Sequence, residues 1–163
     1  MRIIGIDPGL NATGFGVIEH NKSGSKLIAA GVVRTSVKEL IQDRLNKIYN
    51  GISEIIRQEK PEVLVLEKVF SHYKHPTTAI SLGYARGIIC LVSGRAEIPI
   101  KSYAAKRVKK AITGRGDAQK QQVQRMVQHL LSIKEEKMPF DLSDALALAL
   151  AYTYLDKIEG GRR

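Results

Sequence analysis

A continuous apolar run, Val63-Leu64-Val65-Leu66, restricts the folds that this chain can adopt. Strands with one solvent-facing side alternate apolar and polar residues, whereas strands buried on both faces carry unbroken runs of branched apolar residues. The run therefore predicts a central strand in a sheet that helices cover on both faces. Near the N-terminus, Ile3-Ile4-Gly5-Ile6 has the same character and predicts a second buried strand.

Periodicity and turn residues place the other elements along the chain. Strands are predicted at 2–7, 13–19, 27–34, 63–66 and 98–101, and helices at about 36–59, 77–95, 103–112, 118–132 and 141–157. Asp117 is expected to N-cap the helix at 118–132. Three meandering strands followed by alternating helices and strands predict an α/β fold, a five-stranded mixed sheet with helices on both faces. The length of 163 residues suits a single domain, expected at 1–158, with a short basic C-terminal tail at 159–163.

The positive charge is concentrated in one part of the chain. There are 26 Lys and Arg against 16 Asp and Glu, and the formal net charge is +10. Between residues 101 and 125 there are eight bases and one acid. Such a local basic block is typical of a protein that binds a polyanion, although a solvated lysine-rich helix face would also produce it.

Two further features bear on where the protein works. The apolar runs are far shorter than the ~20 residues of a membrane span, so we expect a cytoplasmic protein without a membrane partner. The single cysteine, Cys90, lies in an apolar run and cannot form an internal disulfide. It is expected to be a core thiol in a reducing compartment.

Four carboxylates stand where apolar elements reach the surface. Asp7 and Glu67 end the two buried strands, and Asp141 and Asp144 open an otherwise apolar helix. Residues i and i+3 share a helix face, and neighbouring strands would bring Asp7 and Glu67 together. Taken singly, Asp7 before a Pro-Gly pair fits a turn residue, and Asp141 fits a helix N-cap. Asp144 is harder to explain in this way, because an acid one turn into a buried helix needs a partner.

Four converging carboxylates repel one another unless a cation or protons neutralise them. Mg²⁺ favours carboxylate, water and phosphate oxygens as ligands. Two such ions about 3.5–4 Å apart can activate a water and stabilise the leaving oxygen of a phosphodiester. Together with the basic block, the four acids point to a metal-dependent nuclease.

Five segments resemble, in the same order, the bacterial RuvC family of crossover-junction endonucleases: IDPGLNATGFGV, EKVF, LGYARG, AAKRVKKAITGRGDAQKQQV and DLSDALALA. The resemblance covers almost the whole chain. It implies a ribonuclease H-like fold and a crossover junction endodeoxyribonuclease that resolves Holliday junctions by paired, symmetric, metal-dependent nicks in DNA recombination and repair. It also implies a homodimer, four-way junction DNA as substrate, and the branch-migration proteins RuvA and RuvB as partners.

The resemblance also assigns residues. The family's catalytic, metal-binding carboxylates match Asp7, Glu67, Asp141 and Asp144, which implies an all-carboxylate site for two Mg²⁺ ions, with Mn²⁺ as a substitute. Contacts to the DNA are expected from Phe70, Tyr73, Lys106, Lys109, Lys110, Arg115 and Lys120. Phe70 matches the aromatic residue of the EKVF segment. It is either a ring that stacks on an unpaired base or a core aromatic.

Two glycines predict a feature of the helix at 77–95. Glycine inside a helix costs up to ~1 kcal/mol relative to alanine, so close packing should compensate at Gly83 and Gly87. The partner is either the protein's own core or the helix of a second subunit, and the resemblance favours the second subunit. The expected dimer interface consists of Gly83, Tyr84, Gly87, Ile88 and Leu91.

Two other functions fit parts of the sequence. A non-catalytic junction or nucleic-acid binding module of the same fold would explain the basic block. It would not explain the four acids, because acids near DNA repel phosphate unless a metal lies between them. A strand, an acid and a hairpin also open the actin-like ATPases, whose hairpin cradles phosphates. Those proteins have two such domains, and 163 residues is too short for both.

Overall fold

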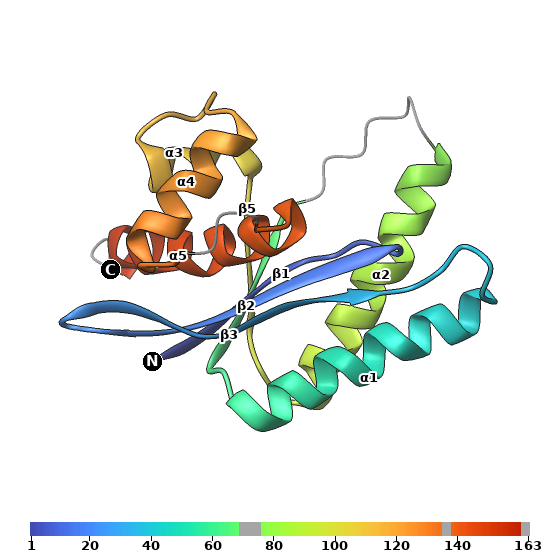
Figure 1. Cartoon of the computed structure of the whole chain (residues 1–163). Coiled ribbons are helices and arrows are strands. Elements are labelled where there is room, and N and C mark those ends of the chain that lie inside the picture. The colour runs from blue at the N-terminus through green and yellow to red at the C-terminus, as the bar shows by residue number, and fades with distance from the viewer. Residues whose placement is uncertain (69–75, 135–137, 161–163) are drawn as a thin grey trace.

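The computed structural model describes residues 1–68, 76–134 and 138–160 (Figure 1). Five strands form one sheet in the order β3-β2-β1-β4-β5. They are β1 (Arg2–Asp7), β2 (Ala12–Asn21), β3 (Gly24–Arg34), β4 (Val63–Glu67) and β5 (Ile100–Tyr103). β1, β2 and β3 pair in antiparallel fashion, whereas β4 lies parallel to both β1 and β5. The prediction of a mixed five-stranded sheet is confirmed.

Helices cover the sheet on both faces, as predicted. They are α1 (Ile41–Glu59), α2 (Pro76–Arg95), α3 (Ala105–Thr113), α4 (Lys120–Leu130) and α5 (Phe140–Gly160). In Figure 1, α1 and α2 lie on one side of the sheet and α3, α4 and α5 on the other. Alternate residues of the central strand β4 join the two resulting cores: Leu64 and Leu66 pack in the α1 and α2 core, and Val63 and Val65 in the α3 to α5 core. This is the structural reason for the unbroken apolar run.

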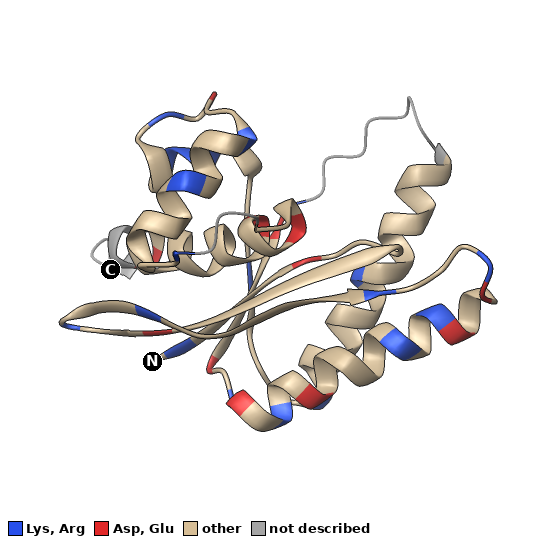
Figure 2. Cartoon of the chain, viewed as in Figure 1, with Lys and Arg blue, Asp and Glu red and all other residues tan. Residues whose placement is uncertain are grey.

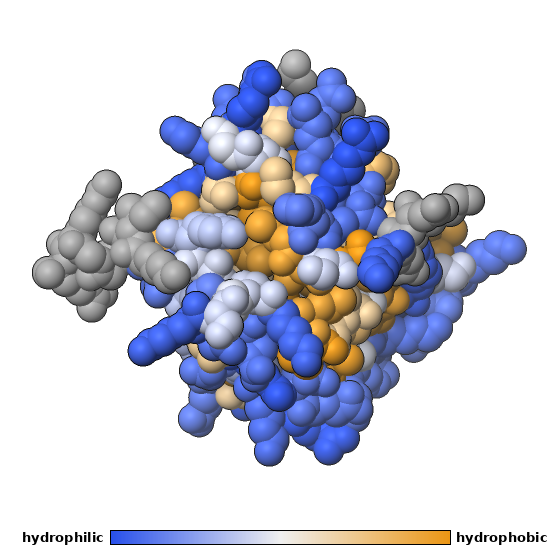
Figure 3. Space-filling model, turned by 60° about the vertical axis from the view of Figure 1, so that its left-hand side comes forward, coloured by the Kyte–Doolittle hydropathy of each residue, from blue (hydrophilic) through white to orange (hydrophobic). Residues whose placement is uncertain are grey.

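The sheet ends at β3, which is an edge strand. Its apolar residues Leu27, Ile28 and Val33 are only partly buried, although they pack against the two cores. A space-filling view shows apolar residues gathered across the middle of one face, with hydrophilic residues above and below (Figure 3).

Glycines in β1 and β2 allow α5 to lie unusually close to the sheet. A Cβ atom added at Gly5 would overlap the backbone carbonyl of Ala145, and one added at Gly14 would overlap the carbonyl of Asp141. Neither position tolerates a side chain unless the helix moves. The glycines therefore determine how closely α5, including its first turn, packs against β1 and β2.

The first helix begins later than predicted. α1 starts at Ile41 rather than at residue 36, and Leu40 is its N-cap with an extended backbone conformation. Val37 is 75% exposed and Leu40 is 64% exposed. The predicted start of this helix at residue 36 is therefore wrong, and Val37 and Leu40 do not join the core.

The predicted N-cap of α4 is also wrong. Gln119 occupies that position, and its backbone N–H donates to Oε1 of Gln122 at 2.8 Å. Asp117 instead forms an ion pair with Arg115. Ala118 is buried, so the chain must reach the core before the helix can start.

Three further boundaries or placements differ from the predictions. β5 occupies residues 100–103 rather than 98–101. Cys90 is exposed on α2 rather than buried in the core. α5 continues to Gly160, so the predicted tail at 159–163 begins inside the helix, and residues 161–163 lie outside the described part of the chain. Across the described residues, no helix is long and apolar enough to cross a membrane.

Candidate active site

Two of the four acids meet at one edge of the sheet. β1 and β4 are parallel neighbours, and Ile6 pairs with Leu66. The next residues, Asp7 and Glu67, are the last residues of the two strands and therefore lie next to each other. Both strands are buried along their length, and their acids mark the points where they reach the surface. The condition on which the sequence argument depended, that the first and fourth strands are neighbours, is therefore met.

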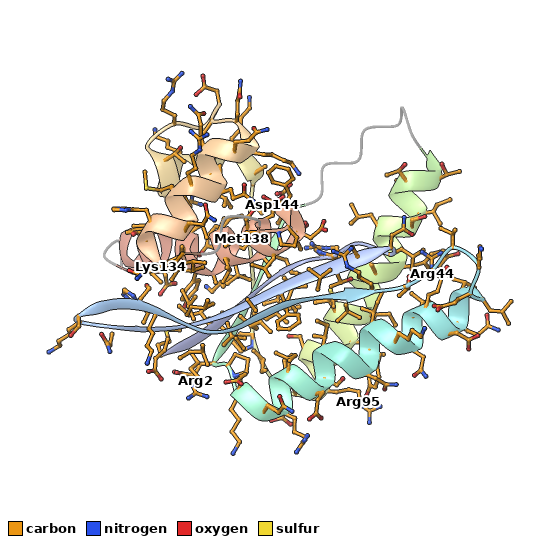
Figure 4. The ribbon with its side chains drawn as sticks, in the orientation of Figure 1. Arg2, Arg44, Arg95, Lys134, Met138 and Asp144 are labelled. Atoms are coloured by element: carbon orange, nitrogen blue, oxygen red, sulfur yellow. The ribbon has the colours of Figure 1, made fainter. Side chains whose placement is uncertain are left out.

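The first turn of α5 brings the other two acids to the same place. Asp141 and Asp144 lie one turn apart, and the glycine of β2 opposite Asp141 lets the helix approach. Figure 2 shows acidic residues at the start of α5, directly above the sheet. Figure 4 labels Asp144 in this position. Asp7 therefore senses the charges of the three other predicted carboxylates, although the four come from three elements far apart in sequence.

Among these acids, Asp7 has the most strongly shifted pKa. The pKa of Asp7 is raised from 3.8 to about 7, first by burial and then by the charges of Asp144, Asp141 and Glu67, whereas the charge of Lys120 lowers it. The pKa of Glu67 is also raised, first by partial removal of water and then by Asp144. Without a cation, the cluster therefore tends to hold a proton near neutral pH.

Lys120 supplies a positive charge to this cluster from the start of α4. Its Nζ lies 3.2 Å from Oδ2 of Asp144 and 5.9 Å from the centre of the Phe140 ring. The neighbouring carboxylates raise the pKa of the Lys120 ammonium, with Asp144 the largest contributor. Lys109 of α3 acts in the same sense, because its charge lowers the pKa of Glu67.

A cavity of about 300 Å³ opens beside the acids. Asp7, Glu67 and Asp144 line it together with Lys109 and Lys120. Within the described residues, the acid side chains do not already form a set of three metal ligands. The donor chemistry nevertheless fits a hard divalent cation, because Asp7 senses the charges of the three other carboxylates and its raised pKa reflects a cluster without a neutralising cation.

The remaining predicted DNA contacts of the basic block lie on α3 and on the turn before α4. Lys106 and Lys110 are exposed, and Lys109 is half-buried against the acid-lined cavity. Arg115 is exposed in the turn and pairs with both oxygens of Asp117, at 3.2 and 3.1 Å. Figure 2 shows this group of basic residues above the acids at the start of α5. The aromatic residues Phe70 and Tyr73 lie outside the described residues.

The predicted interface residues lie along α2. Gly83, Tyr84, Gly87 and Leu91 are exposed, with Tyr84 at 49% and Leu91 at 51%. A Cβ atom at Gly83 or Gly87 would meet no described atom within 4 Å, so packing against the protein's own core does not explain these glycines. Ile88 differs, because it packs against the core between α1 and α2.

Sequence reasoning missed one arginine at the edge of the site. Arg86 of α2 donates from Nη1 to the backbone carbonyl of Glu67 at 2.7 Å, and from Nη2 to Oγ of Ser102 at 3.3 Å. Its bonds tie α2 to the ends of β4 and β5. An arginine within an apolar helix was the available signal, but only the packing shows which backbone group it reaches.

Comparisons with known proteins agree with this geometry. Residues 3–152 match the family model described as crossover junction endodeoxyribonuclease RuvC. The curated crossover junction endodeoxyribonuclease RuvC of Desulforamulus reducens is 41% identical over 99% of both chains. That of Rhodopirellula baltica is 41% identical over 94% of this chain and 86% of its own.

A solved structure is similar over almost the same length. Thermus thermophilus RuvC in complex with Holliday junction substrate superimposes with a TM-score of 0.91 at 31% identity, covering 98% of this chain and 96% of that one. The order of the strands, the convergent acids and these matches lead to one conclusion. The chain belongs to the RuvC family of crossover junction endodeoxyribonucleases.

Proposed function

We propose that this protein resolves Holliday junctions by metal-dependent cleavage of DNA during recombination and repair in the cytoplasm. The observation that carries the proposal is the electrostatic coupling of Asp7 to Glu67, Asp141 and Asp144, next to Lys109 and Lys120. The chain also belongs to this family. Family members of known structure include one solved with a Holliday junction bound. Binding DNA alone does not require a buried carboxyl group whose pKa is raised to about 7, whereas such perturbed groups are typical of catalytic sites.

The four carboxylates are proposed to hold two Mg²⁺ ions, for which Mn²⁺ can substitute. Bound in this way, the ions would activate a water and stabilise the leaving oxygen of the phosphodiester. The chain's own contribution is to supply deprotonated carboxylates at fixed positions. Lys120 supports this by lowering the pKa of Asp7 and Glu67, and Arg86 supports it by fixing the end of β4.

The basic residues are proposed to bind the sugar-phosphate backbone. Lys106, Lys110 and Arg115 form an exposed group suited to phosphates. Lys109 and Lys120 lie closer to the acids and are proposed to offset charge that develops on the cleaved phosphate. Phe70 and Tyr73 remain proposed contacts to the junction.

The protein is proposed to act as a homodimer through the exposed face of α2. A four-way junction offers two equivalent strands, and a twofold dimer presents two equivalent sites. Ile80, Tyr84 and Leu91 are large exposed apolar side chains on this helix, and the open space at Gly83 and Gly87 suits a closely approaching second helix. Paired, symmetric nicks then follow, with RuvA and RuvB as proposed partners.

The deciding experiment compares cleavage of a four-way junction with cleavage of a duplex of the same sequence, with Mg²⁺ and with EDTA. Junction-selective, Mg²⁺-dependent, paired nicks are expected. Asp7→Asn, Glu67→Gln, Asp141→Asn and Asp144→Asn should each nearly abolish cleavage and leave junction binding largely intact. Tight junction binding without cleavage in any metal would instead favour the non-catalytic module.

A further inference from the structure

A second cavity lies on the other side of the acid cluster. It has a volume of about 520 Å³. It is bounded by residues 9–11 of the turn between β1 and β2, by the first residue of β2, by Val37 and Arg44, by the first turns of α2, and by Asp141. Asp141 thus borders this cavity, whereas Asp7, Glu67 and Asp144 border the smaller one. The two cavities therefore border different members of the same group of acids.

A buried arginine forms one wall. Arg44, from the first turn of α1, is only 8% exposed. Its Nε donates to Oγ1 of Thr35 at 2.9 Å, and its Nη2 donates to Oδ1 of Asn11 at 2.5 Å. These bonds hold the guanidinium at the end of the sheet where β1 turns into β2, as Figure 4 shows for its labelled side chain.

This arginine has no full counter-ion in the part of the chain that the structure describes. Arg44 makes no ion pair there, and its Nη1 makes no hydrogen bond. Its charge lowers the pKa of Glu39, but only as the smallest of the causes, and Glu39 is itself paired with Lys47 at 2.6 Å. A buried cation of this kind is stabilised by an anion, and the cavity beside it has room for one.

The N-terminus of α2 forms another part of the wall. Thr77, Thr78 and Ser81 line the cavity from the first two turns of this helix of 20 residues. The first N–H groups of a helix lack partners within the helix and favour anions. Asn11 adds a further donor, because its amide oxygen accepts from Arg44 and its NH₂ group makes no hydrogen bond to another described residue.

The cavity therefore presents donors from three directions and one acid, Asp141. An anion bound next to Asp141 would be repelled, so the favourable position lies between Arg44 and the start of α2. The cation proposed for the acid cluster would reduce the remaining repulsion. The donor set, a guanidinium, hydroxyls, an amide and a helix N-terminus, is the set that recognises phosphate.

We propose that this cavity binds a backbone phosphate of the DNA strand next to the phosphate that is cut. Arg44, Asn11, Thr78 and Ser81 form the phosphate pocket and hold the strand in register over the acids. This inference rests on the proposed function, because it concerns the path of the same substrate strand. Free inorganic phosphate shares the chemistry, so the experiment must separate the two sources.

The experiment uses four-way junctions that each carry one uncharged methylphosphonate, scanned across the phosphates flanking the cut. Wild-type cleavage should fall at one flanking position by roughly 10- to 100-fold, as for loss of a charge-assisted hydrogen bond. Arg44→Gln should cause a similar loss on the native junction and little further loss on that modified junction. This non-additivity is the signature of a direct contact.

A second variant covers the case in which Arg44→Gln does not fold. Thr78→Val combined with Ser81→Ala removes hydroxyls from partly or fully exposed positions on the far wall, and should show the same non-additivity at the same phosphate. Lys22→Gln is the charge-matched control, because Lys22 is exposed in the turn between β2 and β3 and does not line the cavity. Its effect should add to that of every methylphosphonate.

The outcomes separate the two proposals. Additive effects of the pocket variants at every phosphate would overturn the pocket, while cleavage by the wild type would leave the proposed function intact. If inorganic phosphate raises the melting temperature of the wild type but not of the pocket variants, and methylphosphonates have no coupled effect, the pocket binds free phosphate and the DNA assignment is wrong. A wild type that cuts no junction would count against the proposed function itself.

Discussion

The ammonium of Lys120 lies 3.2 Å from Oδ2 of Asp144, so the first residue of α4 contacts the first turn of α5. The contact places a positive charge against a cluster of four carboxylates. The same charge lowers the pKa of Asp7 and of Glu67. Lys120 therefore acts on the ionisation of residues that it does not touch, and its removal should be visible in the pH dependence of the proposed reaction.

For Lys120→Gln we expect cleavage of the junction to fall at least tenfold at pH 7, with a much smaller effect on binding. The pKa of Asp7 is about 7 with Lys120 present, and loss of the lysine raises it further. Fewer molecules then have the ionised carboxylate that a metal ligand must be. The acidic limb of the pH–rate profile should move to higher pH, and raising the pH to 8.5 should recover part of the activity.

The matched control is Lys110→Gln, which removes an exposed lysine from α3 that does not line the acid cavity. It should weaken binding in a salt-dependent manner and leave the pH profile unchanged. If Lys120→Gln behaves like this control, Lys120 is a phosphate contact and does not tune the acids.

The second prediction concerns stability, and its sign follows from the raised pKa of Asp7. Between the ordinary value of 3.8 and about 7, the folded protein holds a proton on Asp7 that the unfolded chain releases. The stabilising effect of this proton is complete below pH 3.8 and is lost as the pH rises through 7. The metal-free protein should therefore lose up to about 4 kcal/mol of folding free energy across this range through Asp7.

Asp7→Asn should remove this loss. In EDTA at pH 8, urea unfolding should show the variant to be more stable than the wild type, although it is inactive. At pH 5 the two should differ less. Mg²⁺ should raise the melting temperature of the wild type and have little effect on the variant.

Asp43→Asn, at an exposed acid on α1, is the control and should show no such gain in stability. If the Asp7→Asn variant is less stable than the wild type at pH 8, ionisation of Asp7 does not destabilise the folded protein as we predict.

The third prediction is that Arg86 positions the end of β4. Its guanidinium holds the backbone carbonyl of Glu67 at 2.7 Å and Oγ of Ser102 at 3.3 Å. Arg86→Gln should lower the maximal cleavage rate by about tenfold or more while junction affinity stays within a few-fold, because small displacements of a catalytic group are costly. Arg86→Lys, which keeps the charge and one donor, should recover part of the rate. Equal losses of affinity and rate would show that Arg86 is a DNA contact instead.

The fourth prediction tests the proposed dimer. A Cβ atom at Gly87 would meet no described atom within 4 Å, and leucine has a higher helix propensity than glycine, so Gly87→Leu should fold at least as well as the wild type. It should nevertheless weaken the dimer, because a second helix could no longer approach. Sedimentation should show more monomer than for the wild type, and Gly87→Ala should have a smaller effect.

Cys90 provides an independent measurement of the same interface. It is exposed on α2 in the single subunit, three residues after Gly87. Maleimide should therefore label it slowly in the wild-type dimer and faster in Gly87→Leu. Fast labelling of a wild type that sediments as a dimer would place the interface on another surface.

The sequence by itself determined the parts of this protein that depend on burial along a single element. The apolar runs at 3–6 and 63–66 specified strands covered on both faces. The acids that follow them could be predicted to lie at the surface, at the ends of these strands. The i, i+3 spacing of Asp141 and Asp144 placed both on one helix face. The family resemblance then identified these acids as a set.

Only the tertiary structure decided which residues face one another. Periodicity encodes that one side of an element is buried, but the partner on that side depends on how elements pack. The bonds of Arg44 to Asn11 and Thr35, and those of Arg86 to Glu67 and Ser102, join residues with no pattern that links them in sequence. The same reason accounts for the errors at Val37, Leu40 and Cys90. Their apolar neighbours resemble core segments, yet the described part of the fold covers little of their side chains, so these residues are left exposed.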